Sequence, residues 1–77
     1  MKFRIKHIKG IGYWPQVKKG CVWSKIGDHG DQGFGLYEES DISHPYLNED
    51  ECREIITAFN EWVKLKTQKP TYIEVEI

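Results

Sequence analysis

Residues 48 to 68 carry the pattern of one long amphipathic helix, which limits the possible folds of this chain more than any other stretch. Asn48 is placed to cap the helix, Glu51 completes a capping box, and Pro70 prevents the helix from continuing. We expect a helix over residues 49 to 66, with acids at its start and lysines near its end, as the helix dipole favours. We interpret its apolar stripe as core rather than as a filler of a partner's groove, because a chain of 77 residues has no other large apolar face. The stripe recurs at steps of three and four residues and contains Cys52, Ile55, Ile56, Phe59, Trp62 and Val63.

Both ends of the chain, residues 2 to 9 and residues 71 to 77, alternate between apolar and polar side chains with the period of two that is typical of a half-buried strand. If the two strands are neighbours, the basic row of the first lies beside the acidic row of the last, and both apolar rows meet the helix. We therefore expect the last strand to lie beside the first. The rows are Phe3 and Ile5 against Lys2, Arg4 and Lys6 in the first strand, and Thr71, Ile73, Val75 and Ile77 against Tyr72, Glu74 and Glu76 in the last.

The middle of the chain has the pattern of a meander of short strands. Residues 13 to 18 predict a strand that Pro15 confines to an edge or a bulge, residues 21 to 26 predict the next, and residues 34 to 38 are a candidate for one more. Turns and a polar, glycine-rich loop separate them. The sequence thus predicts a single α+β domain over residues 1 to 77, with a mainly antiparallel sheet of three to five strands and the helix packed on one face.

The charge of the chain is unevenly distributed, although its net value is only −1. Residues 1 to 26 carry seven basic and no acidic residues, whereas residues 27 to 77 carry twelve acidic and four basic ones. Such asymmetry indicates either an anionic partner or mutual neutralisation on folding, and the charged rows at the two ends favour neutralisation.

The apolar runs and the cysteines of the sequence indicate the cellular compartment in which the protein is expected. No run of about twenty apolar residues is present, and Met1 to Arg4 lack the apolar region of a signal peptide. We therefore expect a cytoplasmic protein that does not bind membranes. In that compartment Cys21 and Cys52 are expected to be free thiols.

The sequence lacks the motifs of a catalytic, cofactor or metal site. Gly10-Ile11-Gly12 lacks the third glycine of a dinucleotide-binding loop, and no Walker A motif is present. The loop from Asp28 to Glu39 has Gly30 and Leu36 where a calcium loop needs oxygen ligands. The histidines and cysteines are not spaced as zinc ligands, and no local signature marks Cys21 as a nucleophile. We expect no enzymatic activity, no cofactor and no metal.

A strip of aromatic and basic residues between residues 13 and 25 is the strongest functional signal. We predict a protein-binding site there and expect Trp14 or Trp23 to be partly exposed, because exposed aromatic rings with charged rims are typical of interaction hot spots. The alternative is single-stranded nucleic acid, with the rings stacked on bases and the lysines on phosphates. Stacking of the two tryptophans across the ribbon, which would be purely structural, also stays open. The candidate binding residues are Tyr13, Trp14, Lys18, Lys19, Trp23 and Lys25.

The order of three strands with Trp14 and Trp23, a capped helix over Glu49 to Val63 and a last strand over Thr71 to Ile77 resembles that of small accessory proteins encoded by bacteriophages and prophages. The likeness covers most of the chain in size and layout, contains no diagnostic motif and assigns no residue. It implies a protein that binds and modulates a host or phage macromolecule, for example as an inhibitor. We expect a monomer or a homodimer, the latter assembled through an unpaired strand edge near residues 13 to 18.

Overall fold

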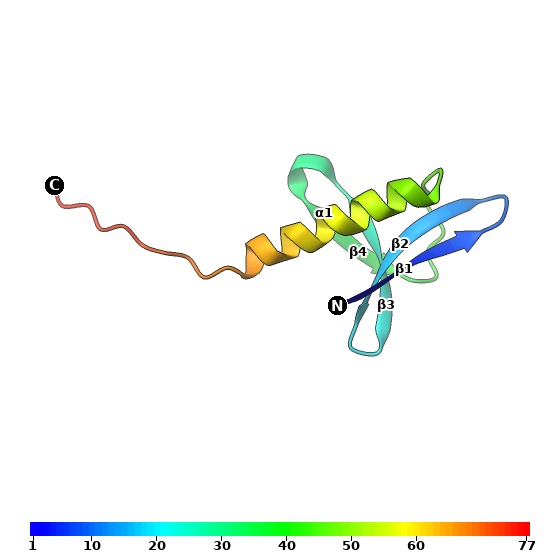
Figure 1. The fold of residues 1–77 in the computed structure, drawn as a ribbon, viewed down its shortest axis with the longest axis horizontal. Coiled ribbons are helices and arrows are strands. Elements are labelled where there is room, and N and C mark those ends of the chain that lie inside the picture. Colours follow the sequence, from blue (N-terminus) through cyan, green and yellow to red (C-terminus); the bar gives the residue numbers. More distant parts are fainter.

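The computed structural model describes residues 1 to 77 and has an α+β architecture (Figure 1). Four antiparallel strands form one sheet, and one α-helix packs on it, so the predicted fold class is confirmed. The elements are, in chain order, β1 (Lys2–Ile8), β2 (Gly12–Lys19), β3 (Val22–Asp28), the 3-10 turn η1 (Gly30–Gln32), β4 (Phe34–Glu38) and α1 (Glu49–Thr67).

The sheet is a meander in which each strand pairs with the one before it, in the order β1-β2-β3-β4. The pairing of β2 with β1 covers Gly12 to Lys18, whereas β3 pairs only with Gln16 to Lys19 of β2. Pro15, which has no backbone N–H, therefore lies opposite Ile5 on a part of β2 that forms no ladder with β3. Gly20, with a φ of 60°, adopts the left-handed conformation in the two-residue turn between β2 and β3.

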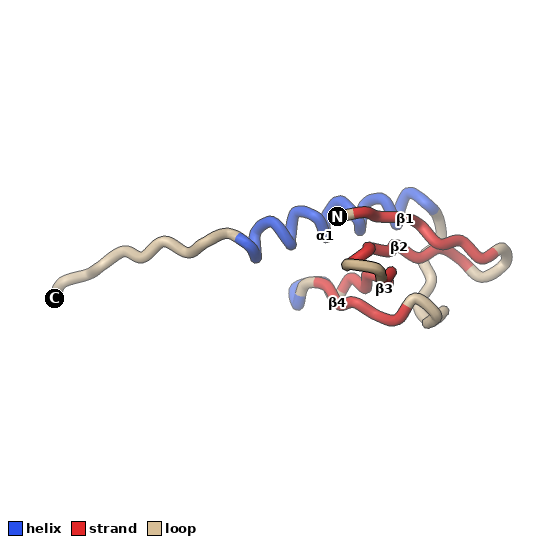
Figure 2. Tube along the Cα trace, turned by 90° about the horizontal axis from the view of Figure 1, so that it is seen from below, coloured by secondary structure: helices blue, strands red, loops and turns tan.

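α1 covers one face of the sheet, and the core lies between the two layers (Figure 2). Val17 of β2 and Ile26 of β3 pack there against Ile55 and Phe59 of α1. The ring of Phe59 makes edge-on contacts with aromatic rings on β1 and β4. The interpretation of the apolar stripe as core is therefore confirmed. Partly buried side chains that complete the core are Phe3, Phe34, Tyr46, Ile56, Trp62 and Val63.

The start of α1 follows the prediction in one respect and departs from it in another. Asn48 Oδ1 accepts a hydrogen bond from the Glu51 amide at 2.9 Å, so Asn48 is the N-cap. The Glu51 carboxylate does not close a capping box on the Asn48 amide; it accepts the N–H of Leu47 at 3.0 Å instead. The helix ends at Thr67, and Gln68 is already extended.

The prediction of a strand over residues 71 to 77 beside the first strand is wrong. Residues 68 to 77, which we call the tail, form no strand, and all of them are exposed. Figure 1 shows the tail continuing from α1 away from the sheet. The reason is that alternation with period two specifies how side chains divide between two faces, but not whether a neighbouring strand is present. The carboxylate beside Arg4 and Lys6 comes instead from Glu39.

Candidate functional site

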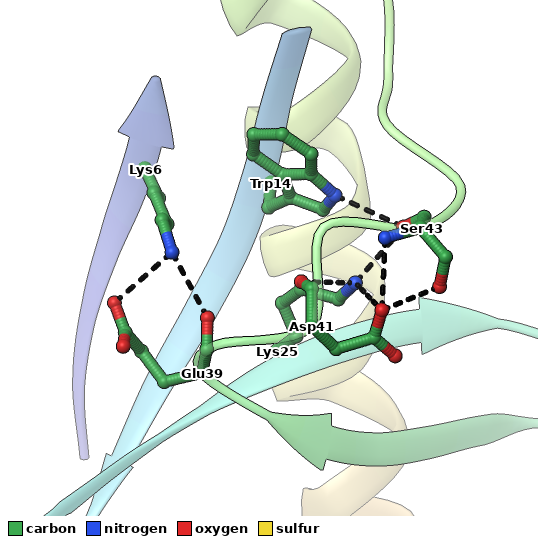
Figure 3. A network of polar contacts seen from close by, with 6 residues as sticks. All are labelled: Lys6, Trp14, Lys25, Glu39, Asp41 and Ser43. Atoms are coloured by element: carbon green, nitrogen blue, oxygen red, sulfur yellow. Dashed lines mark hydrogen bonds and ion pairs between the residues drawn. The ribbon is translucent and has the colours of Figure 1, made fainter. Parts of the chain in front are cut away.

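Residues 39 to 48, which join β4 to α1 and which we call the connector, cross the sheet face opposite α1 (Figure 3). Tyr46 of the connector forms an antiparallel bridge with Tyr13 of β2, with N–H to oxygen distances of 2.8 and 3.1 Å. This bridge lies on the stretch of β2 that does not pair with β3. The connector thereby satisfies backbone groups of β2 that would otherwise face solvent.

Two side chains of the sheet hold the connector down by hydrogen bonds to its backbone (Figure 3). Trp14 Nε1 donates to the Ser43 carbonyl oxygen at 3.1 Å. Lys25 Nζ donates to the carbonyl oxygens of Asp41 at 2.8 Å and of Ser43 at 2.9 Å. Only 6% of the Lys25 side chain is exposed. Its ammonium group needs such hydrogen-bond partners, because burial of the charge without them would be costly in free energy.

Two carboxylates of the connector are stabilised in their charged form. Hydrogen bonds from the Ser43 hydroxyl and amide to Asp41, followed by the nearby Lys25 charge, lower the pKa of Asp41. A hydrogen bond from Lys6 and its charge lower the pKa of Glu39. Asp41 and Ser43 were not singled out in the sequence; an aspartate two residues before a serine is a local turn signal that could have pointed to them.

The six residues predicted as a binding strip do not form one accessible surface. Trp14 is 1% exposed and Lys25 is 5% exposed, so neither side chain can contact a partner in this conformation. Tyr13 is half-buried, and its ring stacks on His7 at 4.1 Å between centroids. The prediction that Trp14 or Trp23 is partly exposed is confirmed, because Trp23 is half-buried.

The two tryptophans do not stack across the ribbon. Trp23 pairs with Lys18 and Trp14 with Lys6 in the strand registers, so the rings are not cross-strand partners. The guanidinium of Arg4 lies over the Trp23 ring at 4.0 Å. Of the strip, Lys18, Lys19 and part of Trp23 remain accessible at the β2–β3 turn.

A polar hollow of about 730 Å³ lies between the connector and the end of β3. The His29 ring Nε2 and the Tyr37 hydroxyl are 2.5 Å apart at its wall, and Gly27 leaves room for both rings. The Ser43 hydroxyl donates a hydrogen bond to the Asp41 carboxylate at 2.6 Å. No cluster of three metal-ligating side chains exists anywhere in the chain.

A second hollow, of about 460 Å³, lies between β1 and α1 at the edge of the sheet, and we call it the edge groove. Its apolar lining is Phe3 and Ile5 of β1 with Ile56 of α1. Glu49 and Arg53 form an ion pair of 2.7 Å on its helix side. β1 has a paired strand only on its other side, so the groove runs along an open strand edge.

The tail carries several large apolar side chains that the fold leaves uncovered. Tyr72 is 87% exposed, Ile73 89% and Val75 79%, and no backbone hydrogen bond outside the regular elements involves the tail. Monomeric domains rarely leave several large apolar side chains together in solvent without a partner for them. The tail and the edge groove are therefore the candidate interaction elements, in place of the strip between residues 13 and 25.

Comparisons of the chain with protein-family models, curated proteins and solved structures gave no match. The helix α1 lacks the combination of length and apolarity that crossing a membrane requires.

Proposed function

We propose that this protein is a non-enzymatic interaction module that binds another protein chain by adding residues 71 to 77 to it as a β-strand. The observation that carries the proposal is the exposure of Ile73 and Val75, which alternate with Glu74 and Glu76 and pack on nothing in the fold. This alternation gives a strand one apolar and one charged face.

The composition of the segment suits strand addition. Thr71, Tyr72, Ile73 and Val75 are residue types that favour extended backbone, and Pro70 keeps the preceding residue extended as well. In strand addition the main chain supplies hydrogen bonds to a partner's sheet edge, and alternate side chains supply specificity. A segment that is already extended and outside the core can bind in this way without disturbing the fold, at the cost of its own ordering.

The burial of two residues of the predicted strip supports the proposal. Trp14 and Lys25, central to the predicted strip, hold the connector and are buried. Nucleic-acid binding through the strip would depend on Lys18, Lys19 and a Trp23 ring already covered by Arg4. The proposal therefore uses the tail as the binding element. The modulating role implied by the resemblance to phage-encoded accessory proteins stays a prediction.

Affinity capture with matched variants tests the proposal. The immobilised chain of residues 1 to 77 is exposed both to cell lysate and to an untagged copy of itself, and retained proteins are compared with those of an Ile73→Asp, Val75→Asp variant. The control is an Ile11→Asp, Val22→Asp variant, which replaces an exposed apolar residue of the β1–β2 turn and one at the start of β3 by the same charges. We expect the wild type and the control to retain the same protein and the tail variant to lose it.

Two further measurements make the outcome specific. Amide hydrogen exchange of residues 71 to 77 should slow in the presence of the retained protein, because strand addition protects backbone amides. Retention of the same protein by the tail variant contradicts the proposal. A salt-dependent change of tryptophan emission on adding single-stranded oligonucleotide, with no captured protein, would support the nucleic-acid alternative instead.

A further inference from the structure

We infer that the sheet edge that receives the tail is β1 of a second copy of this chain, so that two copies exchange residues 71 to 77. The inference rests on the proposed function, since it names the partner of the same segment. It follows from three independent features: the open edge of β1, the edge groove beneath it, and the direction in which the tail leaves α1.

The charge of the two sheet edges favours β1 over β4. The outer face of β1 carries Lys2, Arg4 and Lys6, of which Glu39 neutralises one charge. The remaining excess of two positive charges equals the two negative charges of the tail at positions 74 and 76. β4, the opposite edge, ends in Glu38 and would place like charges beside the tail.

The two faces of the tail match the two faces of β1 at the same time. β1 and the segment from Thr71 to Ile77 have the same length, seven residues. When Glu74 lies on the basic face of β1, the period of two places Ile73 and Val75 on the other face. That face is the edge groove, where Ile56 and the side chains of β1 leave about 460 Å³ open to solvent.

The groove also gives the apolar side chains of the tail a place that the monomer does not provide. Phe3 and Ile5 are only half-buried because no strand continues the sheet beyond them. Two β-branched residues seated there would cover these side chains, and the burial of their apolar surface would offset the cost of ordering the tail.

The direction of the chain argues against pairing of the tail with β1 of its own copy. Phe3 contacts Phe59 and Ile5 lies near Arg53, so β1 runs from the middle of α1 toward the start of the helix. A tail returning to the same β1 would therefore run parallel to it, in the less stable ladder. The chain would also have to reverse within residues 68 to 70, where Gln68 is extended and Pro70 disfavours a helical Lys69.

A second copy has neither restriction. Its β1 can meet the tail in the antiparallel direction, and the exchange is reciprocal, which closes the assembly as a two-fold dimer. The tail already points away from its own sheet (Figure 1). No refolding of the body is needed for the exchange.

Sedimentation equilibrium of the chain of residues 1 to 77 tests the inference, with loading concentrations up to about 1 mM to cover weak association. We expect the mass of the wild type to double with increasing concentration. The Ile11→Asp, Val22→Asp control should behave in the same way, and the Ile73→Asp, Val75→Asp variant should keep the mass of one copy. Raising the salt concentration should weaken association, because the charges at the edge are exposed.

Amide exchange locates the contact in the same samples. Amides of both the tail and β1 should exchange at least about tenfold more slowly in the associated state. A wild type that keeps the mass of one copy overturns the inference, as does doubling that persists in the tail variant. If the wild type does not associate but the tail captures a different protein, the inference fails while the proposed function stands. If the tail captures nothing, both fail.

Discussion

Lys25 Nζ lies 2.8 Å from the backbone carbonyl oxygen of Asp41, although the two residues are 16 positions apart and belong to different layers of the fold. The same ammonium reaches the Ser43 carbonyl oxygen at 2.9 Å and lies 3.7 Å from the Asp41 carboxylate. A buried cation on the sheet thus replaces its water shell with the backbone of the connector. Lys25, which the sequence placed among the candidate binding residues, instead clamps the connector to the sheet.

Replacement of Lys25 by methionine should destabilise the protein. The side-chain volume is nearly kept, but the Asp41 carbonyl oxygen loses its donor, and an unmade hydrogen bond of this kind costs about 1 to 3 kcal/mol. The free energy of unfolding is obtained from urea titration followed by circular dichroism. Lys19→Met, at an exposed position, is the control and should change stability by less than about 0.5 kcal/mol. Equal effects of the two substitutions would show that Lys25 does not clamp the connector.

Stability should fall in acid through Asp41 and Glu39. The pKa of each carboxyl is lower in the folded state than its ordinary values of 3.8 and 4.5, so the unfolded chain binds more protons in acid. Their contribution is present above these ordinary values and is lost as the pH falls through the lowered ones. Urea midpoints from pH 7 to pH 2.5 measure the loss.

The double variant Glu39→Gln, Asp41→Asn should lose less stability between neutral and acidic pH than the wild type does. Asp31→Asn serves as control, because Asp31 is exposed and forms no ion pair in the fold. An acid profile of the double variant that parallels that of the wild type would rule out this source of pH dependence.

The two cysteines should differ sharply in reactivity. Burial raises the pKa of the Cys52 thiol to about 11, whereas Cys21 is exposed at the β2–β3 turn. At pH 8 only about one thousandth of Cys52 is the reactive thiolate, and the reagent cannot reach it. A thiol-reactive dye should label one equivalent rapidly and the second only in denaturant. Labelling of a Cys21→Ser variant at the fast rate in native buffer would contradict the burial of Cys52.

Loss of the N-cap should weaken α1 by a measurable amount. Asn48→Ala removes the acceptor of the Glu51 amide and should cost about 1 kcal/mol. Asn60→Ala, within the same helix, removes no hydrogen bond of the fold and exchanges asparagine for a better helix former, so it should be neutral or slightly stabilising. Unfolding titrations of both variants give the comparison, and an unchanged Asn48→Ala protein would remove the assigned cap.

The parts of the fold that were predictable from the sequence are those with local signals. The helix stripe, its cap at Asn48 and the strand over residues 34 to 38 are encoded within a few residues by periodicity and capping chemistry. The tail shows the limit of such signals: its alternation is that of a strand, yet strand formation needs a neighbour that the local sequence does not specify.

The candidate site was less predictable because it depends on contacts between distant residues. The connector has no periodic pattern, so its passage over Trp14 and Lys25 could not be anticipated from the residues themselves. Once it lies there, a tryptophan and a lysine typical of binding surfaces become buried. The edge groove likewise arises only when α1 and β1 are placed side by side and β1 is left without a second neighbour.

The thermal stability of the wild type should depend on protein concentration, whereas that of the Ile73→Asp, Val75→Asp variant should not. Association with a second copy stabilises the folded chain by mass action, so the Tm rises with concentration only where exchange of the tails is possible. In the single copy both side chains touch nothing, so their replacement should leave the Tm at high dilution within about 1 °C of the wild-type value. Differential scanning calorimetry over a wide range of concentrations measures both effects, and the Ile11→Asp, Val22→Asp control should keep the dependence. If the Tm of wild type and tail variant rises in parallel, the stabilising contact lies outside residues 71 to 77; if neither rises, the tails do not bind a second copy.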